Sequence, residues 1–146
     1  MTLNKLKIKL TVVVTFLMQL FAISYAGNAI DFSSPENTVK TYYEHYFDKD
    51  VVVKCFYPEQ YFNKKDKWWL DYKILKVEKS KKIGEKTHSN IVINRDAKEI
   101  VVEVTMNHSQ KGNPKTKFWY LLQKVSDEWK IIEHSHIADK NYPTYD

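Results

Sequence analysis

The chain has 146 residues, of which 43% are apolar and 28% charged, with only three glycines and four prolines. This composition excludes a disordered, collagen-like or low-complexity protein, and the length suits one domain with a single hydrophobic core. One cysteine excludes an intrachain disulfide framework and any multi-cysteine zinc or iron–sulfur site. Aromatic residues make up 14% of the chain, which predicts a core or cavity built from rings.

Residues 1–26 have the three-part pattern of a secretory signal peptide. Three lysines precede an uncharged apolar stretch over residues 11–23, and Ser24-Tyr25-Ala26 places small residues before a cleavage point. The apolar stretch is shorter than the roughly 18 to 20 residues that span a bilayer. We therefore expect a secreted or periplasmic protein whose Sec-type signal is cleaved after Ala26. An uncleaved anchor is the alternative, and it is the only membrane contact expected.

The basic charge of the chain comes largely from this segment. The full chain has a formal charge of +5, and residues 1–26 contain three lysines and no acidic residue, so cleavage leaves +2. The remaining lysines are scattered along the sequence and do not form the clustered patch that phosphate backbones require. No binding of nucleic acid is expected.

A polar lead over residues 27–33 is followed by a strong helix start. Ser34 can cap the helix, Pro35 suits its first position, and Glu36 places negative charge near its N-terminus. One helical face is apolar and mostly aromatic, and it comprises Val39, Tyr42, Tyr43, Tyr46 and Phe47.

The chain then changes from helical to strand periodicity. A second short helix is predicted over residues 51–57, although its valines also suit a strand, and Pro58 begins a further turn or helix that runs through Tyr61 and Phe62. Alternating patterns separated by short turns then predict five antiparallel strands, over residues 72–78, 86–93, 99–108, 115–125 and 128–137. The fold class is therefore α+β, with the N-terminal helices packed on a curved antiparallel sheet.

The strand over residues 115–125 is apolar on both faces, so both faces must be covered. The helices can cover one face, and a dimer partner or the aromatic segments must cover the other. The closing hairpin of residues 115–137 is expected at the middle of the sheet, with Trp129 largely buried. In the preceding strand, Ile100, Val102, Val104 and Met106 share one face.

These patterns resemble the exported NTF2-like domains of bacteria. The resemblance rests on the capped helix of residues 34–43, the segment Tyr57-Pro58-Glu59, and the closing hairpin with its Trp129-Lys130-Ile131 strand. It implies a cone-shaped α+β domain over residues 34–138, followed by a tail over 139–146. It also implies three helices against a bent sheet, a pocket between them and dimerisation through the sheet. The superfamily includes isomerases, dehydratases, hydrolases and binding domains, so the fold does not select a function.

Two histidines are weak candidates for chemistry. His134 and His136 are two residues apart on a strand, so both face the same side, together with Ile132 and opposite Glu133. The pair could bind a metal, act as acid and base, bind a ligand or be structural. A metal site needs a third and usually a fourth ligand, and the other histidines, His45, His88 and His108, lie at distances that the sequence does not give, so neither a metal nor a cofactor is predicted.

Acidic residues give no pattern typical of a pocket enzyme. Glu103 comes closest, on a strand face with Val101 and Thr105, while the other acids considered lie at segment ends: Asp48, Asp50, Glu59, Asp66 and Asp71. Cys55 is expected to be a buried, inert thiol among apolar neighbours.

Adjacent tryptophans, Trp68 and Trp69, follow a lysine-rich segment and are the most unusual local feature. They could grip a carbohydrate, a lipid interface or a partner protein, or they could pack beneath the sheet and at the helix junction. The predicted ligand-binding residues are Tyr43, Tyr46, Trp69, Tyr120, His134 and His136.

Two functions follow as hypotheses. The first is non-enzymatic binding or scaffolding of a small apolar ligand or a protein partner, with a homodimer through the sheet. The second is a pocket enzyme of isomerase, dehydratase or hydrolase type that uses His134 or His136 as acid or base.

Cleavage of the signal can be tested directly. Intact-mass measurement of protein from the extracytoplasmic fraction should give a chain that begins at Gly27. A mature mass that includes residues 1–26 would reject cleavage and favour a membrane anchor.

Overall fold

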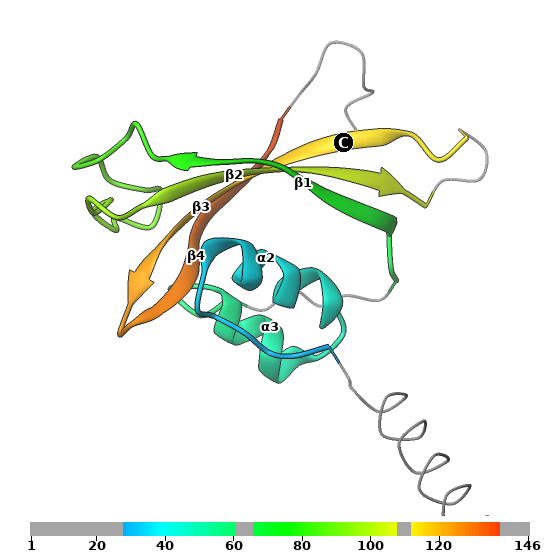
Figure 1. Cartoon of the computed structure of the whole chain (residues 1–146), viewed down its shortest axis with the longest axis horizontal. Coiled ribbons are helices and arrows are strands. Elements are labelled where there is room, and N and C mark those ends of the chain that lie inside the picture. The colour runs from blue at the N-terminus through cyan, green and yellow to red at the C-terminus, as the bar shows by residue number, and fades with distance from the viewer. Residues whose placement is uncertain (1–27, 61–65, 108–111, 138–146) are drawn as a thin grey trace, which may run out of the picture.

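The computed structural model describes residues 28–60, 66–107 and 112–137, so the predicted signal peptide and C-terminal tail lie outside the described residues. Its elements are α2 (Pro35–Glu44), α3 (Lys49–Cys55), β1 (Trp69–Lys79), β2 (Lys98–Met106), β3 (Lys115–Val125) and β4 (Glu128–Ile137). The predicted α+β class is confirmed (Figure 1). None of the helices in the described part of the chain has the length and apolarity needed to cross a bilayer.

Both helices begin at the polar caps that the sequence offers. The Ser34 hydroxyl accepts a hydrogen bond from the Asn37 backbone at 3.1 Å, and the Asp48 carboxylate accepts from the Asp50 and Val51 backbones. The second helix starts and ends two residues earlier than predicted. It ends at Cys55 because the next residues pair with β4, where the Tyr57 N–H donates to the Ile131 carbonyl at 2.9 Å. Of the further turn or helix predicted from Pro58, the part at residues 61 and 62 lies outside the described residues.

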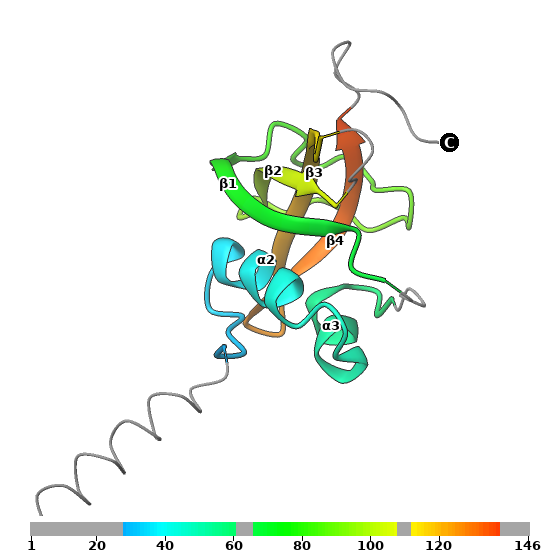
Figure 2. The same ribbon diagram turned by 90° about the vertical axis from the view of Figure 1, so that its right-hand side faces the viewer.

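The four strands form one antiparallel sheet in the order β1-β2-β3-β4. The sheet arches over α2 and α3, so it has a concave face toward the helices and a convex face away from them (Figures 1 and 2). Register shifts at Leu70 and Leu75 in β1 and at Ile132 in β4 each leave one extra residue. Such bulges bend a strand and increase its twist, which suits the curvature seen here.

The prediction of a strand over residues 86–93 is wrong. These residues belong to the β1–β2 loop, residues 80–97, where only an isolated bridge joins Lys86 to Val92. Positive φ angles at Gly84 (85°) and Asn90 (60°) turn the backbone on both sides of that bridge, which prevents an extended strand. The sheet therefore has four strands in the described residues instead of five.

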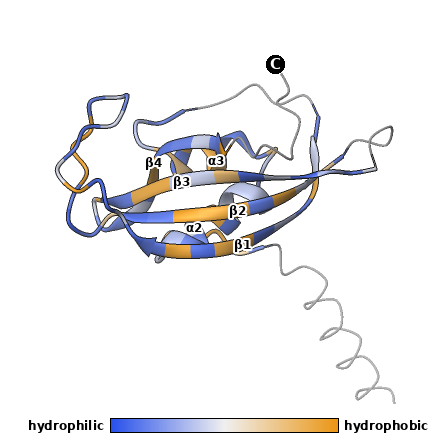
Figure 3. Cartoon of the chain, turned by 90° about the horizontal axis from the view of Figure 1, so that it is seen from above, coloured by the Kyte–Doolittle hydropathy of each residue, from blue (hydrophilic) through white to orange (hydrophobic). Residues whose placement is uncertain are grey.

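The loop instead covers part of the convex face. Ile93 and Ala97 pack with Leu121 and Ile132 in a second apolar cluster, and the Gln123 side chain accepts from the Asn94 backbone at 3.0 Å. The apolar stretch of the loop is visible beyond the ends of the strands (Figure 3). A segment of the same chain thus covers part of the second apolar face of β3, which the sequence analysis assigned to a partner or to aromatic segments.

The position predicted for the closing hairpin is wrong in part. β3 is an interior strand, but β4 is an edge strand, whose outer side is met by single backbone contacts from Phe32, Phe56 and Tyr57 instead of a further strand of the described residues. A strand that is apolar on both faces need not be central when a loop covers one face. Trp129 is buried as predicted, with 7% of its surface exposed.

Aromatic rings fill the space between α2 and the concave face, which confirms the prediction of a ring-built core. The Tyr43 ring stacks on Tyr72 at a centroid distance of 4.5 Å, and its edge contacts Trp69 at 5.3 Å. The Tyr43 hydroxyl forms a hydrogen bond of 2.7 Å with the Tyr120 hydroxyl. The predicted inward face of β2 is buried at Ile100, Val102 and Val104.

The hydroxyl pair gives a test of this core. Tyr43→Phe or Tyr120→Phe alone leaves a buried hydroxyl without its partner, so each should lower the free energy of unfolding by about 1–3 kcal/mol. The double variant removes both hydroxyls and should cost clearly less than the sum of the two single changes. Urea unfolding of the four proteins measures the coupling. Tyr57→Phe, at a residue that is 44% exposed, is the matched control, and additive costs would contradict the pairing.

Candidate binding site

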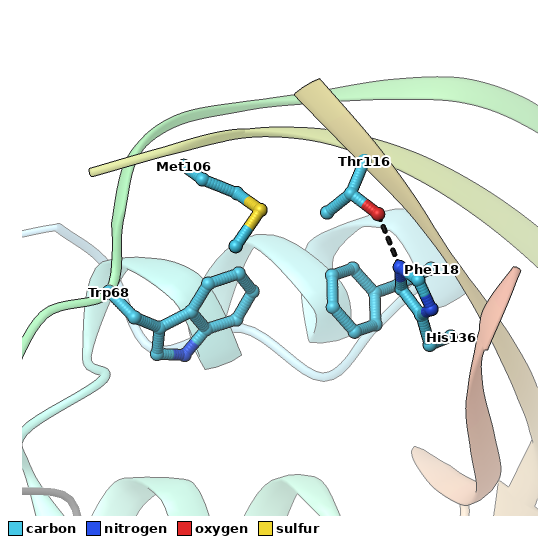
Figure 4. A pocket seen from close by; sticks show the side chains of 5 residues that line it. All are labelled: Trp68, Met106, Thr116, Phe118 and His136. Carbon is cyan, nitrogen blue, oxygen red and sulfur yellow. Dashed lines mark hydrogen bonds between the residues drawn. The ribbon is translucent and has the colours of Figure 1, made fainter. Parts of the chain in front are cut away.

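A recess of about 370 Å³ opens on the concave face at one end of the sheet. Its lining comprises Trp68, Met106, Thr116, Phe118 and His136 (Figure 4). We call it the aromatic recess. Its size falls within the range of small-molecule sites, and most of its lining side chains are aromatic or apolar.

The strand register brings these residues together. Phe118 of β3 lies opposite His136 of β4, and Thr116 lies opposite Val104 of β2, so all three side chains share the concave face. Met106 ends β2 on the same face. Trp68 precedes β1 and is held there because its carbonyl accepts from the Asn107 backbone at 2.8 Å.

Rings line the recess on two sides. The centroid of the Trp68 ring lies 5.3 Å from that of Phe118, and Phe118 lies 5.2 Å from the His136 ring. The Met106 side chain lies beside Trp68, across from Thr116 and His136 (Figure 4). A thioether next to rings adapts readily to the shape of an apolar guest.

Two polar side chains of this lining, Thr116 and His136, form a hydrogen-bonded pair. The Thr116 hydroxyl is hydrogen-bonded to the His136 ring nitrogen Nε2, and Thr116 is only 3% exposed. Either atom can donate, depending on the tautomer of the imidazole. No carboxylate is among the lining residues that the structure describes, so this lining supplies no acidic partner for the histidine.

The other candidate histidine lies outside the aromatic recess. His134 shares the concave face with His136, as predicted, but its ring packs against Phe56 at 5.7 Å and Tyr120 at 6.2 Å. It also borders a separate depression with Glu133 and His88, two residues that are hydrogen-bonded to each other. In the described ranges, no group of three His, Cys, Asp or Glu side chains is arranged to hold a metal ion.

The expectation that Ile132 shares the face of the histidines is wrong. Ile132 is the extra residue of the β4 bulge, so it joins the convex cluster while Ile131 packs into the concave core. Sequence spacing alone does not reveal a bulge, because a bulge changes which residues face each side.

The predicted tyrosines and Trp69 lie in the aromatic core instead of the aromatic recess. Tyr43, Tyr46, Trp69 and Tyr120 are each at most 6% exposed. Edges of the first three border a shallow surface recess of about 280 Å³. Of the six predicted ligand-binding residues, the structure therefore brings only His136 to the aromatic recess, and a ligand role for the others stays a prediction.

Sequence reasoning missed most of the recess. Trp68 was singled out with Trp69, and Met106 was assigned to the inward face of β2, but neither pattern shows which inward side chains border open space. Thr116 and Phe118 gave no signal beyond strand alternation. Which inward side chains border open space depends on how far the helices extend beneath the sheet.

Two other predictions about reactive groups can be compared with the structure. Cys55 is fully buried, and its thiol donates to the Val51 carbonyl at 3.5 Å. Glu103 lies on the convex face, where a hydrogen bond from Lys115 lowers the pKa of its carboxyl group. Neither group lies at the aromatic recess.

Comparison of the chain with models of protein families, with curated proteins and with solved structures finds no match.

The buried tyrosines predict how stability depends on pH. Burial raises the pKa of Tyr42, Tyr43 and Tyr120 above 10. In the unfolded chain tyrosine ionises at about pH 10. The stability that the three buried tyrosines gain by staying protonated in the folded protein is therefore complete below that pH. It is lost as the pH rises toward their pKa values in the folded state. The free energy of unfolding should fall by about 1.4 kcal/mol per pH unit for each such tyrosine.

Urea unfolding between about pH 9 and pH 11.5, together with absorbance at 295 nm, measures this effect. Tyr120→Phe should make the decrease in the free energy of unfolding with pH less steep, by the contribution of one tyrosine, which is about 1.4 kcal/mol per pH unit. Ionisation of all tyrosines near pH 10 in the folded protein would contradict their burial.

Proposed function

We propose that the chain is an exported NTF2-like domain that binds a small apolar or aromatic ligand in the aromatic recess and does not transform it. The observation that carries the proposal is the recess itself, in which two rings and a thioether surround a space of about 370 Å³ beside a single hydrogen-bonding pair. A preformed apolar hollow with few polar groups is typical of a ligand site.

The arrangement of the elements supports the NTF2-like part of the proposal. Helices from the N-terminal half pack on the concave face of a bent antiparallel sheet, and the recess lies on that face. The family resemblance implies three helices, whereas two are described in residues 28–60. The further turn or helix that the sequence predicts from Pro58 through Phe62 lies partly outside the described residues.

The lining suggests the chemistry of the ligand. A flat ring or a branched apolar group would fit between Trp68 and Phe118, because offset or edge contacts between rings are favourable. A single hydroxyl or carbonyl on the same ligand could exchange a hydrogen bond with His136 or Thr116. The ligand class is therefore a mainly apolar molecule with one polar group.

Export and self-association complete the proposal. The signal pattern of residues 1–26 supports a secreted or periplasmic location. The convex face carries Glu103 of β2 directly opposite Lys117 of β3, and such mixed charges suit a symmetric dimer through the sheet. A protein partner on the same face is the other form of this proposal.

The second candidate function is a pocket enzyme in which His136 acts as acid or base. The hydrogen bond between His136 and Thr116 at the wall of the recess favours it. Binding without reaction is preferred because the described lining supplies no second titratable group to the recess.

Binding can be measured with the neutral fluorescent probe N-phenyl-1-naphthylamine. Trp68→Ala should weaken its affinity about tenfold or more, since aromatic anchors dominate such sites. Met106→Ala should weaken it less. Leu75→Ala, which removes an exposed apolar side chain from the β1 bulge, is the matched control and should bind as the wild type does. Equal affinity in all four proteins would reject the recess as the site.

Small molecules that copurify with the protein distinguish binding from catalysis. Mass spectrometry should identify an apolar molecule in the wild type that is depleted from Trp68→Ala. Incubation of that molecule with fresh protein should return it unchanged. Conversion that disappears in His136→Ala would instead establish the enzyme.

A further inference from the structure

Another recess, of about 430 Å³, lies at the end of the sheet opposite the aromatic recess. Its lining comprises Lys79, Arg95, Asp96, Lys98, Lys124 and Trp129. We call it the cationic recess. It is separate from the aromatic recess because Lys98 begins β2 whereas Met106 ends it, and the corresponding ends of all four strands can be followed in Figure 1.

The strand register places three lysines on one face. Lys79 lies directly opposite Lys98, whose neighbour on β3 is the concave residue Leu122. Lys124 lies two residues beyond Leu122 and therefore also faces the concave side, opposite Trp129. Like charges directly across a strand pair are destabilising, so this arrangement lowers stability unless an anion lies between them.

Arg95 adds a fourth cation from a different element, the end of the β1–β2 loop. The guanidinium group offers a planar set of donors that matches phosphate or sulfate oxygens, while the ammonium groups act as point charges. Cations from the end of β1, the loop, the start of β2 and the end of β3 thus converge on one hollow.

The surrounding carboxylates do not balance this charge. Asp96 is the single acidic residue among the lining residues, which leaves a formal excess of three positive charges. Two acidic residues that are close in sequence have other partners, since Glu78 pairs with Lys76 at 2.7 Å and Glu128 with Lys130 at 2.6 Å. Among the described residues, no ion pair involves the four cations of the recess.

Trp129 adds one apolar ring to the lining of the cationic recess. The residue is 7% exposed, its backbone N–H donates to the Phe32 carbonyl at 3.0 Å, and its backbone carbonyl accepts from the Thr38 hydroxyl at 3.1 Å. An anion beside this ring would be shielded from water on one side, which strengthens its attraction to the cations.

We infer that the cationic recess binds a small multivalent oxyanion of the phosphate or sulfate ester class. The bound group would sit between Lys79 and Lys98, within reach of Arg95 and Lys124, and would remove the repulsion between the paired lysines. This site is independent of the ligand proposed for the aromatic recess.

Isothermal titration of the full chain with inorganic pyrophosphate, in a phosphate-free buffer of low ionic strength, tests the site. The wild type should bind one pyrophosphate per chain with saturation. Lys98→Gln should weaken the affinity about tenfold or more, because it removes a charge-assisted hydrogen bond. Lys73→Gln removes the same charge from the convex face and should leave the affinity within about twofold of the wild type. A parallel titration with sulfate separates phosphate preference from a general oxyanion site.

Thermal melting provides a second readout. Submillimolar pyrophosphate, with ionic strength balanced by chloride, should raise the Tm of the wild type and of Lys73→Gln but not that of Lys98→Gln. Without pyrophosphate, Lys98→Gln should melt at or above the wild-type temperature, which also shows that it folds. Absence of saturable binding, or equal losses in the two variants, would overturn the proposal.

Discussion

The packing of α2 against the concave face through tyrosine rings is the interaction on which the rest of the structure depends. Tyr43 stacks on β1 through Tyr72 and reaches β3 through the hydroxyl of Tyr120, so one helical residue joins two strands. These side chains fill the centre of the arch, and the aromatic and cationic recesses lie toward its two ends. The positions of these two recesses therefore follow from where the ring-filled core stops.

The two ends of the concave face differ in chemistry because different side chains occupy the inward positions at the two ends of the strands. At one end the side chains of Met106, Phe118 and His136 are apolar or aromatic. At the other, lysines occupy the same inward face of β1, β2 and β3. A single bent sheet thus presents an apolar hollow and a charged hollow on either side of one core.

The helices, most strands and the inward face of β2 could be predicted because each depends on local signals. Ser34 and Pro35 mark the start of α2, and the alternation from Ile100 to Val104 marks the buried face. The strand predicted over residues 86–93 is wrong because a loop that packs on a sheet can also have alternating apolar residues. The loop could be recognised only from long-range contacts such as that of Ile93 with Leu121.

The candidate site was less predictable than the fold. Whether an inward aromatic side chain packs in a core or borders a hollow depends on tertiary structure. Tyr120 and Phe118 are two residues apart on one face of β3, yet Tyr120 packs in the core and Phe118 borders the aromatic recess. The β4 bulge also made a prediction wrong, since one extra residue reversed the face expected for Ile132. Strand alternation shows neither which side chains border a hollow nor where a bulge occurs.

The bulges of β1 have a consequence for how the protein avoids aggregation. β1 is an edge strand of eleven residues, and a flat edge of that length would offer its backbone to another chain. Leu70 and Leu75 each interrupt the regular spacing, and Lys73 and Lys76 add charge along the same edge. An incoming strand would meet a broken register and charged side chains. The irregularity that bends the sheet over its helices therefore also protects the exposed edge from strand addition.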